Sequence, residues 1–397
     1  MYCALTRWIL VPAWLLMLAA CKPGPVATPA GSAGAASAPP AARTMASTSG
    51  PYKVTEMARG LSHPWSLAFL PDGSMLVTER TGQLRRISAS GTVSAPLDGV
   101  PPVLAEGQGG LLDLALAPDF ASSQRLYLSY AEPGEGGTAG TAVASATLGP
   151  TGLSDVKVIY RQLPKLEGAN HFGSRLAFDD RGHLFIGQGD RNNRASAQQL
   201  DVLQGKLVRV DGEGRVPRDN PYLDQPEARP EIWSLGHRNV QGMAFDPRTG
   251  KLWQSEHGPR GGDELNLPRP GLNYGWPVIT HGINYSGMRI PEAEGSAKPG
   301  MEPPHHVWAK SPGLSGMAFY TGRPGTPWND SLFLGALAES NLIRLSLDAD
   351  RIVGEERLLD SVGERIRDVR IGPNGAVYVL TDEANGKLLR IDPPEAT

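Results

Sequence analysis

The chain has 397 residues, including 48 glycines, 35 prolines and two cysteines, and its formal net charge is −3. This length is enough to bury a large core, while the two cysteines exclude both a disulfide framework and a thiolate metal site. The sequence contains no basic stripe, which argues against nucleic acid as a partner.

The first 20 residues have the pattern of a bacterial lipoprotein signal peptide. Arg7 gives a short positive start, and the apolar run Trp8–Ala20 is shorter than the roughly 20 residues that span a bilayer. The run ends in Leu-Ala-Ala before Cys21, which resembles the lipobox where such signals are cut and the cysteine is acylated. An ordinary secretory signal cut nearby is the alternative. We therefore expect a mature chain that begins at a lipidated Cys21.

Residues 21–50 predict a flexible tether. They are rich in Ala, Pro, Gly and Ser and contain no acidic residue, a composition that buries too little apolar surface to fold. Lys22, rather than an aspartate, follows Cys21, which favours the outer membrane over the inner one. We expect a periplasmic lipoprotein held to a membrane by its lipid alone, since no other stretch is long and apolar enough to cross one.

A hairpin-like phrase recurs six times through the rest of the chain. Each copy has a short apolar strand, a turn containing Pro, Asp, Asn or Gly, and a second apolar strand. The copies begin at Leu67, Leu114, Leu176, Met243, Met317 and Val369. They predict an all-β domain over residues 51–394, a six-bladed β-propeller of four-stranded antiparallel blades. A β-sandwich or barrel is the alternative, and the segment 52–58 is expected to complete the last blade and close the ring.

Polar residues interrupt this pattern at strand ends, where a propeller lines its central channel. His171 enters the first strand of the third copy, and Asp190 leaves its second strand. The two ends of a hairpin can be neighbours, so a carboxylate is expected beside the imidazole, as a general base requires. A buried structural histidine is the alternative.

Three other segments carry groups suited to ions. Arg238 and Asn239 offer several donors. Arg365 and Arg367 lie two residues apart, on one side of a strand, where an anion would relieve their repulsion. Acidic side chains and irregular backbone over residues 256–277 supply oxygen ligands of the type that Ca²⁺ takes. Surface loops and solvated faces are the alternatives for each segment alone.

Together these segments resemble the soluble, pyrroloquinoline-quinone (PQQ)-dependent aldose sugar dehydrogenases of the glucose/sorbosone dehydrogenase family. The similarity runs in order through nearly all of residues 51–392. It is carried by the motifs GQGGLL, HFGSRL with GQGD, GHRNVQGMAF, SEHGPRGGDELN, NYGWP and RIRDV. The combination is specific, although no single motif would be. The resemblance implies a quinoprotein that oxidises aldose sugars at C1 to the lactone, with PQQ and Ca²⁺ as cofactors.

The resemblance also implies the roles of single residues. His171 would take the proton of the sugar C1 hydroxyl, and Asp190 would orient and tune that imidazole. Hydride would pass from C1 to the C5 carbonyl of PQQ, while Arg238 would stabilise the charge that grows on the quinone oxygen. Cofactor contacts would come from Gln108, Arg238, Asn239, Arg365 and Arg367, the last two pairing with PQQ carboxylates.

The implied metal ligands lie in the segment 256–277. The carbonyls of Gly258 and Pro259 would bind the Ca²⁺ that chelates PQQ and polarises its C5 carbonyl. Glu264 and the carbonyl of Tyr274 would belong to a second, structural Ca²⁺ site. Trp308 would line the sugar pocket.

Two positions depart from the family pattern. Ala338 stands where the glucose dehydrogenases have a cofactor-binding lysine, and it cannot pair with a carboxylate. His257 stands where some relatives have glutamine, although its neighbouring carbonyls can still bind metal. Two rival functions stay open: Ca²⁺-dependent lactone hydrolysis, which the paired Arg365 and Arg367 disfavour, and a non-enzymatic binding propeller, which Ala338 favours.

Overall fold

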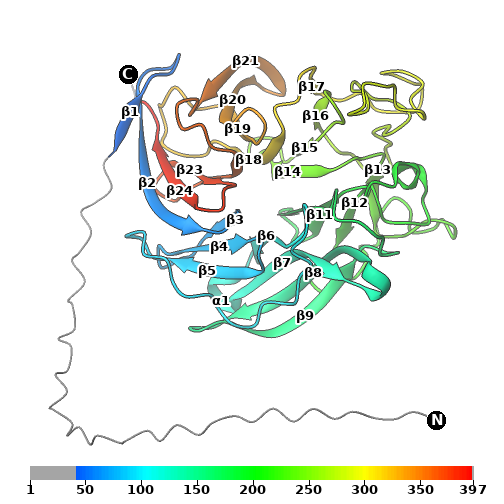
Figure 1. The fold of residues 1–397 in the computed structure, drawn as a ribbon, viewed down its shortest axis with the longest axis horizontal. Coiled ribbons are helices and arrows are strands. Elements are labelled where there is room, and N and C mark those ends of the chain that lie inside the picture. The colour runs from blue at the N-terminus through cyan, green and yellow to red at the C-terminus, as the bar shows by residue number, and fades with distance from the viewer. Residues whose placement is uncertain (1–41, 396–397) are drawn as a thin grey trace, which may run out of the picture. The chain divides into compact units, whose positions relative to one another are not determined.

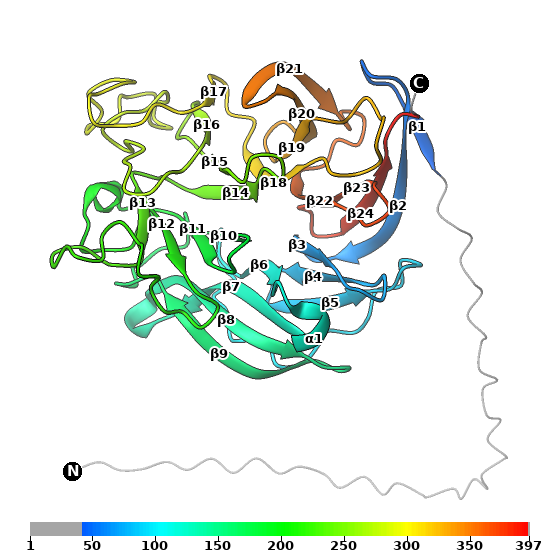
Figure 2. The ribbon, with the colours of Figure 1, turned by 180° about the vertical axis from the view of Figure 1, so that it is seen from behind.

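The computed structural model describes residues 42–395, so the predicted signal peptide 1–20, Cys21 and most of the predicted tether lie outside the described residues. The described residues form 24 strands in six antiparallel sheets, with three short helical turns. Figures 1 and 2 show the sheets arranged around a common centre, and the predicted six-bladed propeller is confirmed. None of the helices in this part of the chain is long and apolar enough to cross a membrane.

The first strand of each hairpin copy lies innermost and contacts the innermost strands of both neighbouring blades, which closes the ring. These inner strands are β3 (Pro64–Phe69), β6 (Leu111–Leu116), β10 (Gly173–Phe178), β14 (Val240–Phe245), β18 (Leu314–Phe319) and β22 (Ile366–Ile371). The second strands are β4 (Met75–Glu79), β7 (Arg125–Pro133), β11 (Leu184–Gln188), β15 (Leu252–Glu256), β19 (Ser331–Ala336) and β23 (Val377–Thr381).

The outer strands follow in the same order around the ring. The third strands are β5 (Gln83–Ile87), β8 (Ala139–Leu148), β12 (Lys206–Val210), β16 (Asp263–Asn266), β20 (Asn341–Asp348) and β24 (Gly386–Asp392). The outermost strands are β9 (Leu153–Arg161), β13 (Ile232–Leu235), β17 (His306–Trp308), β21 (Arg351–Leu358), β2 (Tyr52–Leu61) and β1 (Arg43–Met45). The helical turns are α1 (Phe120–Ser123), η1 (Glu135–Gly137) and η2 (Arg194–Gln198).

Four blades consist of four consecutive strands, whereas the first and last blades differ. The first blade has β3, β4 and β5, followed by a single bridge between Ile87 and Val93. The last blade takes β22, β23 and β24 from the C-terminal part and β2 and β1 from the N-terminal part. Because β2 pairs with β24 in antiparallel register, the predicted closure of the ring by the segment 52–58 is confirmed.

The ordered domain begins earlier than predicted. β1 pairs with β2 through Arg43–Val54 and Met45–Tyr52, and a turn closed by the Gly50 N–H on the Ser47 carbonyl joins the two strands. The predicted tether boundary is therefore wrong for residues 43–50. The physical reason is that the edge of β2 presents unpaired backbone groups, which β1 satisfies whatever its side chains are.

A hydrophobic cluster fills each of the six interfaces between neighbouring blades. Successive side chains of a strand point to opposite faces, so each strand serves two interfaces. In β7, Leu126 and Leu128 pack towards the first blade, whereas Tyr127 packs towards the third. Every blade is thus buried on both faces, and the ring is held by packing all the way round.

A buried ion network joins the inner strands at the centre. Arg175 of β10 donates through Nη1 to Asp113 of β6 at 3.1 Å and to Asp368 of β22 at 2.9 Å. Arg370 binds the same two carboxylates at 3.1 and 3.0 Å. In β18, Gly316 approaches so closely that a Cβ there would meet Asp368 Oδ1 at 2.3 Å. The network therefore fixes how closely the inner strands can approach one another.

Candidate active site

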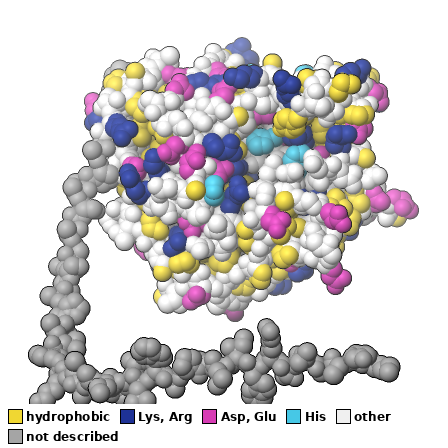
Figure 3. All heavy atoms as spheres, viewed as in Figure 1, with side chains coloured by type: hydrophobic (Ala, Val, Ile, Leu, Met, Phe, Trp, Pro, Cys, Tyr) yellow, Lys and Arg dark blue, Asp and Glu magenta, His cyan; other side chains and the backbone are white. Residues whose placement is uncertain are grey.

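Residues at the start of the inner strands, and residues just after the second strands, enclose a cavity of about 250 Å³. Figure 3 shows histidine and arginine side chains gathered around a hollow near the middle of this face of the ring. The lining residues are Trp65, Arg80, Gly107, Gln108, Phe172, Gly173, Gln241, His257, Leu337, Arg365 and Arg367. All six blades therefore contribute residues to the cavity, each from the part nearest to the axis of the ring.

His171 and Asp190 lie side by side, as their places in the third copy predict. His171 Nδ1 is 2.7 Å from Asp190 Oδ1, and both side chains are buried. His171 has φ of +51°, a left-handed conformation that aims its side chain away from the regular strand. Gly189 permits this turn, because a Cβ there would lie 2.0 Å from the His171 carbonyl oxygen. The second glycine of the GQGD motif is thus needed to bring the pair together.

The environment keeps His171 neutral and Asp190 ionised. Burial lowers the pKa of His171, and the Arg238 charge lowers it further, against the raising effect of Asp190. Burial alone would raise the pKa of Asp190, but the hydrogen bond with His171 and the Arg238 charge bring it below its ordinary value. Nδ1 of His171 faces Asp190, and Nε2 has no hydrogen-bond partner within residues 42–395. This nitrogen is free to accept a proton from a ligand.

Asp190 and the loop that carries His171 are held by three residues that sequence reasoning did not assign. Trp276 Nε1 donates to Asp190 Oδ2 at 2.8 Å, and the Asn192 N–H donates to Oδ1 at 2.8 Å. Arg191 covers the Phe172 ring, with its guanidinium carbon 3.6 Å from the ring centroid, and it donates to the carbonyls of Gly168 and Asn170. These contacts fix both partners of the His171–Asp190 pair.

Gln108 and the Arg238-Asn239 segment meet the same pair from neighbouring blades. Gln108 Oε1 accepts from the His171 N–H at 2.9 Å and lies 3.4 Å from Asn239 Nδ2. The Arg238 carbonyl accepts from the Asp190 N–H at 2.9 Å, and its guanidinium carbon is 5.4 Å from the Trp276 ring centroid. The structure therefore brings the predicted base, its carboxylate and the predicted cation around one end of the channel.

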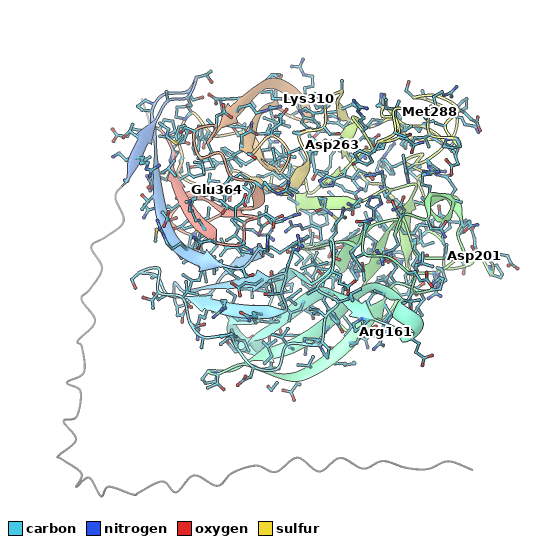
Figure 4. All side chains as sticks on the ribbon, viewed as in Figure 1. Arg161, Asp201, Asp263, Met288, Lys310 and Glu364 are labelled. Carbon is cyan, nitrogen blue, oxygen red and sulfur yellow. The ribbon has the colours of Figure 1, made fainter. Side chains whose placement is uncertain are left out.

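Arg238 also contacts the predicted Ca²⁺ loop. Its Nη1 donates to the carbonyls of His257 at 3.0 Å and Gly258 at 2.6 Å. Asp263, labelled in Figure 4, accepts from the Gly258 N–H at 3.0 Å. A Cβ at Gly258 would lie 2.2 Å from the Gly262 carbonyl oxygen, so only glycine allows this tight loop. Within residues 42–395 no group of three or more His, Cys, Asp or Glu side chains could hold a metal, so a cation here would depend on backbone carbonyls.

The predicted structural Ca²⁺ site contains two carboxylates in close proximity. Glu256 accepts from His237 Nδ1 and from Asn266 Nδ2, each at 3.0 Å. Glu264 accepts from the same Asn266 amide at 3.2 Å. Burial, together with the nearby Glu256 charge, raises the pKa of Glu264 to about 8. Tyr274 joins the cluster by stacking on His237, with ring centroids 5.1 Å apart.

Two amide oxygens in this cluster have no partner in the described part of the chain. They are the buried Oε1 of Gln254 and the buried Oδ1 of Asn266. An unsatisfied buried acceptor costs about 1–3 kcal/mol. Acceptors therefore outnumber donors around Glu264, which is the composition of a cation site.

The predicted pair Arg365 and Arg367 converges on Asp382. Nη2 of Arg367 lies 2.5 Å from Asp382 Oδ2, and Nη2 of Arg365 lies 3.7 Å from it. Ala338 is exposed and follows Leu337, which lines the cavity. The methyl side chain of Ala338 brings no charge to the cavity.

Trp308 is not among the residues that line this cavity, and its place in the sugar pocket stays a prediction. It lies in β17, the outermost strand of the fourth blade, and its ring is part of the core between the fourth and fifth blades. Its Nε1 donates to Glu355 of β21 at 3.0 Å. A buried indole N–H needs an acceptor, and Glu355 supplies it.

Comparison with known proteins matches residues 61–390 to the family described as glucose/sorbosone dehydrogenase. The chain belongs to this family. Aldose sugar dehydrogenase YliI of Escherichia coli (strain K12) is 53% identical over 336 residues, which cover 84% of this chain and 91% of that protein.

Solved structures of sugar dehydrogenases share the fold of this family member. A crystal structure of a glucose dehydrogenase has 59% identity and a TM-score of 0.84, over 85% of this chain and 98% of that one. A PQQ-bound aldose sugar dehydrogenase from Streptomyces coelicolor has 27% identity and a TM-score of 0.69, over 89% of this chain and 100% of that one.

In this family member we predict that Asp190→Asn lowers the pKa of His171 further. Burial already lowers that pKa, and the Asp190 carboxylate opposes the effect through its hydrogen bond and charge. The measurement is an NMR titration of the His171 imidazole against pH. Asp179→Asn is the control, since Asp179 binds His183 at 2.9 Å on the same blade and does not touch His171. An unchanged or higher pKa of His171 in Asp190→Asn would contradict the assignment.

Proposed function

We propose that this glucose/sorbosone dehydrogenase family member oxidises aldose sugars at C1 to lactones, with PQQ as hydride acceptor and Ca²⁺ as its metal. The observation that carries the proposal is the meeting of His171, Asp190 and Arg238 at one end of the channel. The names of the aldose sugar dehydrogenase and glucose dehydrogenase relatives, and the PQQ bound to the Streptomyces coelicolor enzyme, support the choice of substrate and cofactor.

The cavity fits the chemistry of PQQ, a planar tricarboxylate. Arg365 and Arg367 present guanidinium groups to it, and the buried Nε of Arg367 has no partner among residues 42–395. Carboxylates would satisfy such donors through charge-assisted hydrogen bonds. Gln108 and Asn239 would add neutral contacts between these arginines and the base. When bound, PQQ would supply the C5 carbonyl that accepts hydride from the sugar.

His171 would act on the sugar hydroxyl. Its neutral Nε2 would accept the C1 hydroxyl proton as the C1 hydrogen leaves with its electron pair, so that the sugar loses a proton and a hydride to separate acceptors. Asp190 would hold the imidazole in the tautomer with the proton on Nδ1 and stabilise the imidazolium once it forms. Arg238 would place positive charge where negative charge develops.

Ca²⁺ would be held by backbone oxygens beside Arg238. The carbonyl of Gly258 already accepts a cationic donor, and Pro259 is buried next to it. Hard oxygen donors of this kind suit Ca²⁺. Glu264, the carbonyl of Tyr274 and the unsatisfied amide oxygens nearby would hold the second, structural ion.

His171→Gln should lower turnover by about 10²–10⁴-fold, the usual contribution of a general base, while PQQ binding is largely retained. Turnover is measured with purified protein loaded with PQQ and Ca²⁺, an artificial electron acceptor and a panel of aldoses. His183→Gln is the control, because His183 lies on the third blade and its ring pairs only with Asp179 among residues 42–395. Lost PQQ binding with normal residual turnover would contradict the role of His171, and no oxidation of any aldose by the native chain would overturn the proposed function.

Ca²⁺ should raise the melting temperature of the metal-free protein, and Glu264→Gln should abolish much of that rise. A ligand that binds only the folded state stabilises it by about 2.7 kcal/mol at a concentration one hundred times its Kd. The measurement is thermal unfolding after chelation and after Ca²⁺ is restored. Glu355→Gln, which alters a carboxylate on the fifth blade away from this cluster, should respond to Ca²⁺ as the native chain does. An equal response of Glu264→Gln would place the ion elsewhere.

We also propose that the chain is exported and anchored through an acylated Cys21 on the periplasmic side of a membrane, the outer membrane rather than the inner one. The pattern of residues 1–22 supports this. Labelled palmitate should enter the native chain and not Cys21→Ser, which should appear in the soluble periplasmic fraction or stay unprocessed. Equal labelling of both chains would exclude Cys21 as the acylated residue.

A further inference from the structure

Arg80 lines the cavity but has no part in the reaction described so far. It follows β4 of the first blade, and its side chain is 24% exposed. Its Nη2 donates to the Gly107 carbonyl at 2.6 Å, in the turn that carries Gln108. Its own carbonyl packs against Gly110, where a Cβ would come within 2.0 Å. Backbone and side chain are therefore both fixed at the wall of the cavity.

Arg80 shares its counter-ion with Arg365 and Arg367, the two arginines already assigned to the carboxylates of the cofactor. Its Nη1 lies 3.9 Å from Asp382 Oδ1, whereas Arg365 and Arg367 approach Oδ2 of the same carboxylate at 3.7 and 2.5 Å. His63 Nδ1 also lies 3.2 Å from Asp382. Three guanidinium groups thus face one carboxylate in this corner of the cavity.

Two other carboxylates near this corner make contacts elsewhere. Glu383 Oε1 accepts from the Arg365 backbone N–H at 3.4 Å. Glu79, which precedes Arg80, binds Arg85 at 3.0 Å and accepts from the Ser62 N–H at 2.7 Å. Its charge is therefore used outside the cavity. Among the ion pairs within residues 42–395, three arginines of this corner face the single carboxylate of Asp382, an excess of two positive charges.

Donor capacity is also in excess. The buried Nε atoms of Arg80 and Arg367 have no hydrogen-bond partner within residues 42–395. Burial lowers the pKa of Arg80, and repulsion from Arg367 and Arg365 lowers it further, against the pull of Asp382. Buried cations that repel one another are costly unless an anion joins them.

We infer that Arg80 is a third arginine that binds the carboxylates of the cofactor, from the first blade, which neighbours the blade that carries Arg365 and Arg367. The ligand class is a planar aromatic polycarboxylate, since aromatic side chains of Trp65 and Phe172 line the same cavity. This inference rests on the proposed function, because PQQ is the polycarboxylate that the proposed function requires. Arg80 supplies a cation to a cavity in which Ala338 supplies none.

The test is direct binding of PQQ to the cofactor-free protein, followed by absorbance or calorimetry and without any sugar. Arg80→Ala should weaken binding by about 10–100-fold, the loss expected for one charge-assisted hydrogen bond. Arg80→Lys should lose less, since it keeps the charge but not the planar fork of donors. Added NaCl should weaken binding to the native protein more than to Arg80→Ala, because one screened charge is gone.

The trimethyl ester of PQQ separates a charge contact from a structural effect. The native protein should prefer the acid to the ester, and that preference should shrink in Arg80→Ala by the same factor as the loss in affinity. Arg86→Ala is the matched control: Arg86 lies on the same blade, is 34% exposed and binds Asp72 at 3.0 Å. Its binding of both compounds should equal that of the native protein.

Each outcome separates the inference from the proposed function. If the native protein fails to bind PQQ, the proposed function fails and the inference with it. If the native protein binds PQQ and both Arg80 variants bind it equally well, the inference is overturned and the proposed function stands. If Arg80→Ala weakens acid and ester alike, Arg80 only supports the turn at Gly107, and the inference is again overturned.

Discussion

At the centre of the ring, Arg175 lies between Asp113 and Asp368, and 1% or less of each side chain is exposed. Charges removed from water cost several kcal/mol each and persist only with well-placed partners. Here two arginines balance two aspartates, and the backbone N–H groups of Leu176 and Leu67 also bind the two carboxylates. Loss of one partner would leave an uncompensated charge costing about 3–5 kcal/mol. The inner strands are thereby held at one spacing, and this also fixes how far apart the residues at their ends lie.

Gln241 carries this constraint from the network to the site. Its carbonyl accepts from Arg175 Nε at 3.0 Å, while its side chain accepts from Arg367 at 3.1 Å and donates to Asn239 at 3.2 Å. One residue of β14 thus touches the central network, an arginine assigned to the cofactor and the amide beside the base. Trp65 makes a second link, because the guanidinium carbon of Arg175 lies 4.1 Å from its ring centroid and its ring lines the cavity. The side chains that pack the centre of the ring therefore touch the side chains assigned to the cofactor and the base.

The repeated hairpin made much of this predictable from sequence. His171 and Asp190 could be paired because they are the two ends of one hairpin. The same register shows what was overlooked: Arg80 and Asp382 follow the second strands of the first and last blades, the place that His257 and Leu337 hold at the cavity in the fourth and fifth blades. The bond from Trp276 to Asp190 joins residues 86 positions apart, and no local pattern encodes it. Contacts between blades depend on how the ring closes. The repeat in the sequence predicts that a ring forms, but not which residues meet between its blades.

The electrostatics of the cavity differ from those of the chain. The full sequence carries a net charge of −3, yet arginines outnumber carboxylates where Arg365, Arg367 and Asp382 meet. This positive charge acts on the base as well as on an anion. Burial lowers the pKa of His171, and Arg238 lowers it further, while the Asp190 carboxylate limits the fall. A general base must be free of its proton when it meets the substrate, and a developing anion needs a cation beside it. Arg238 meets both needs from one position, so the base and the electrostatic stabiliser are coupled through a single guanidinium group.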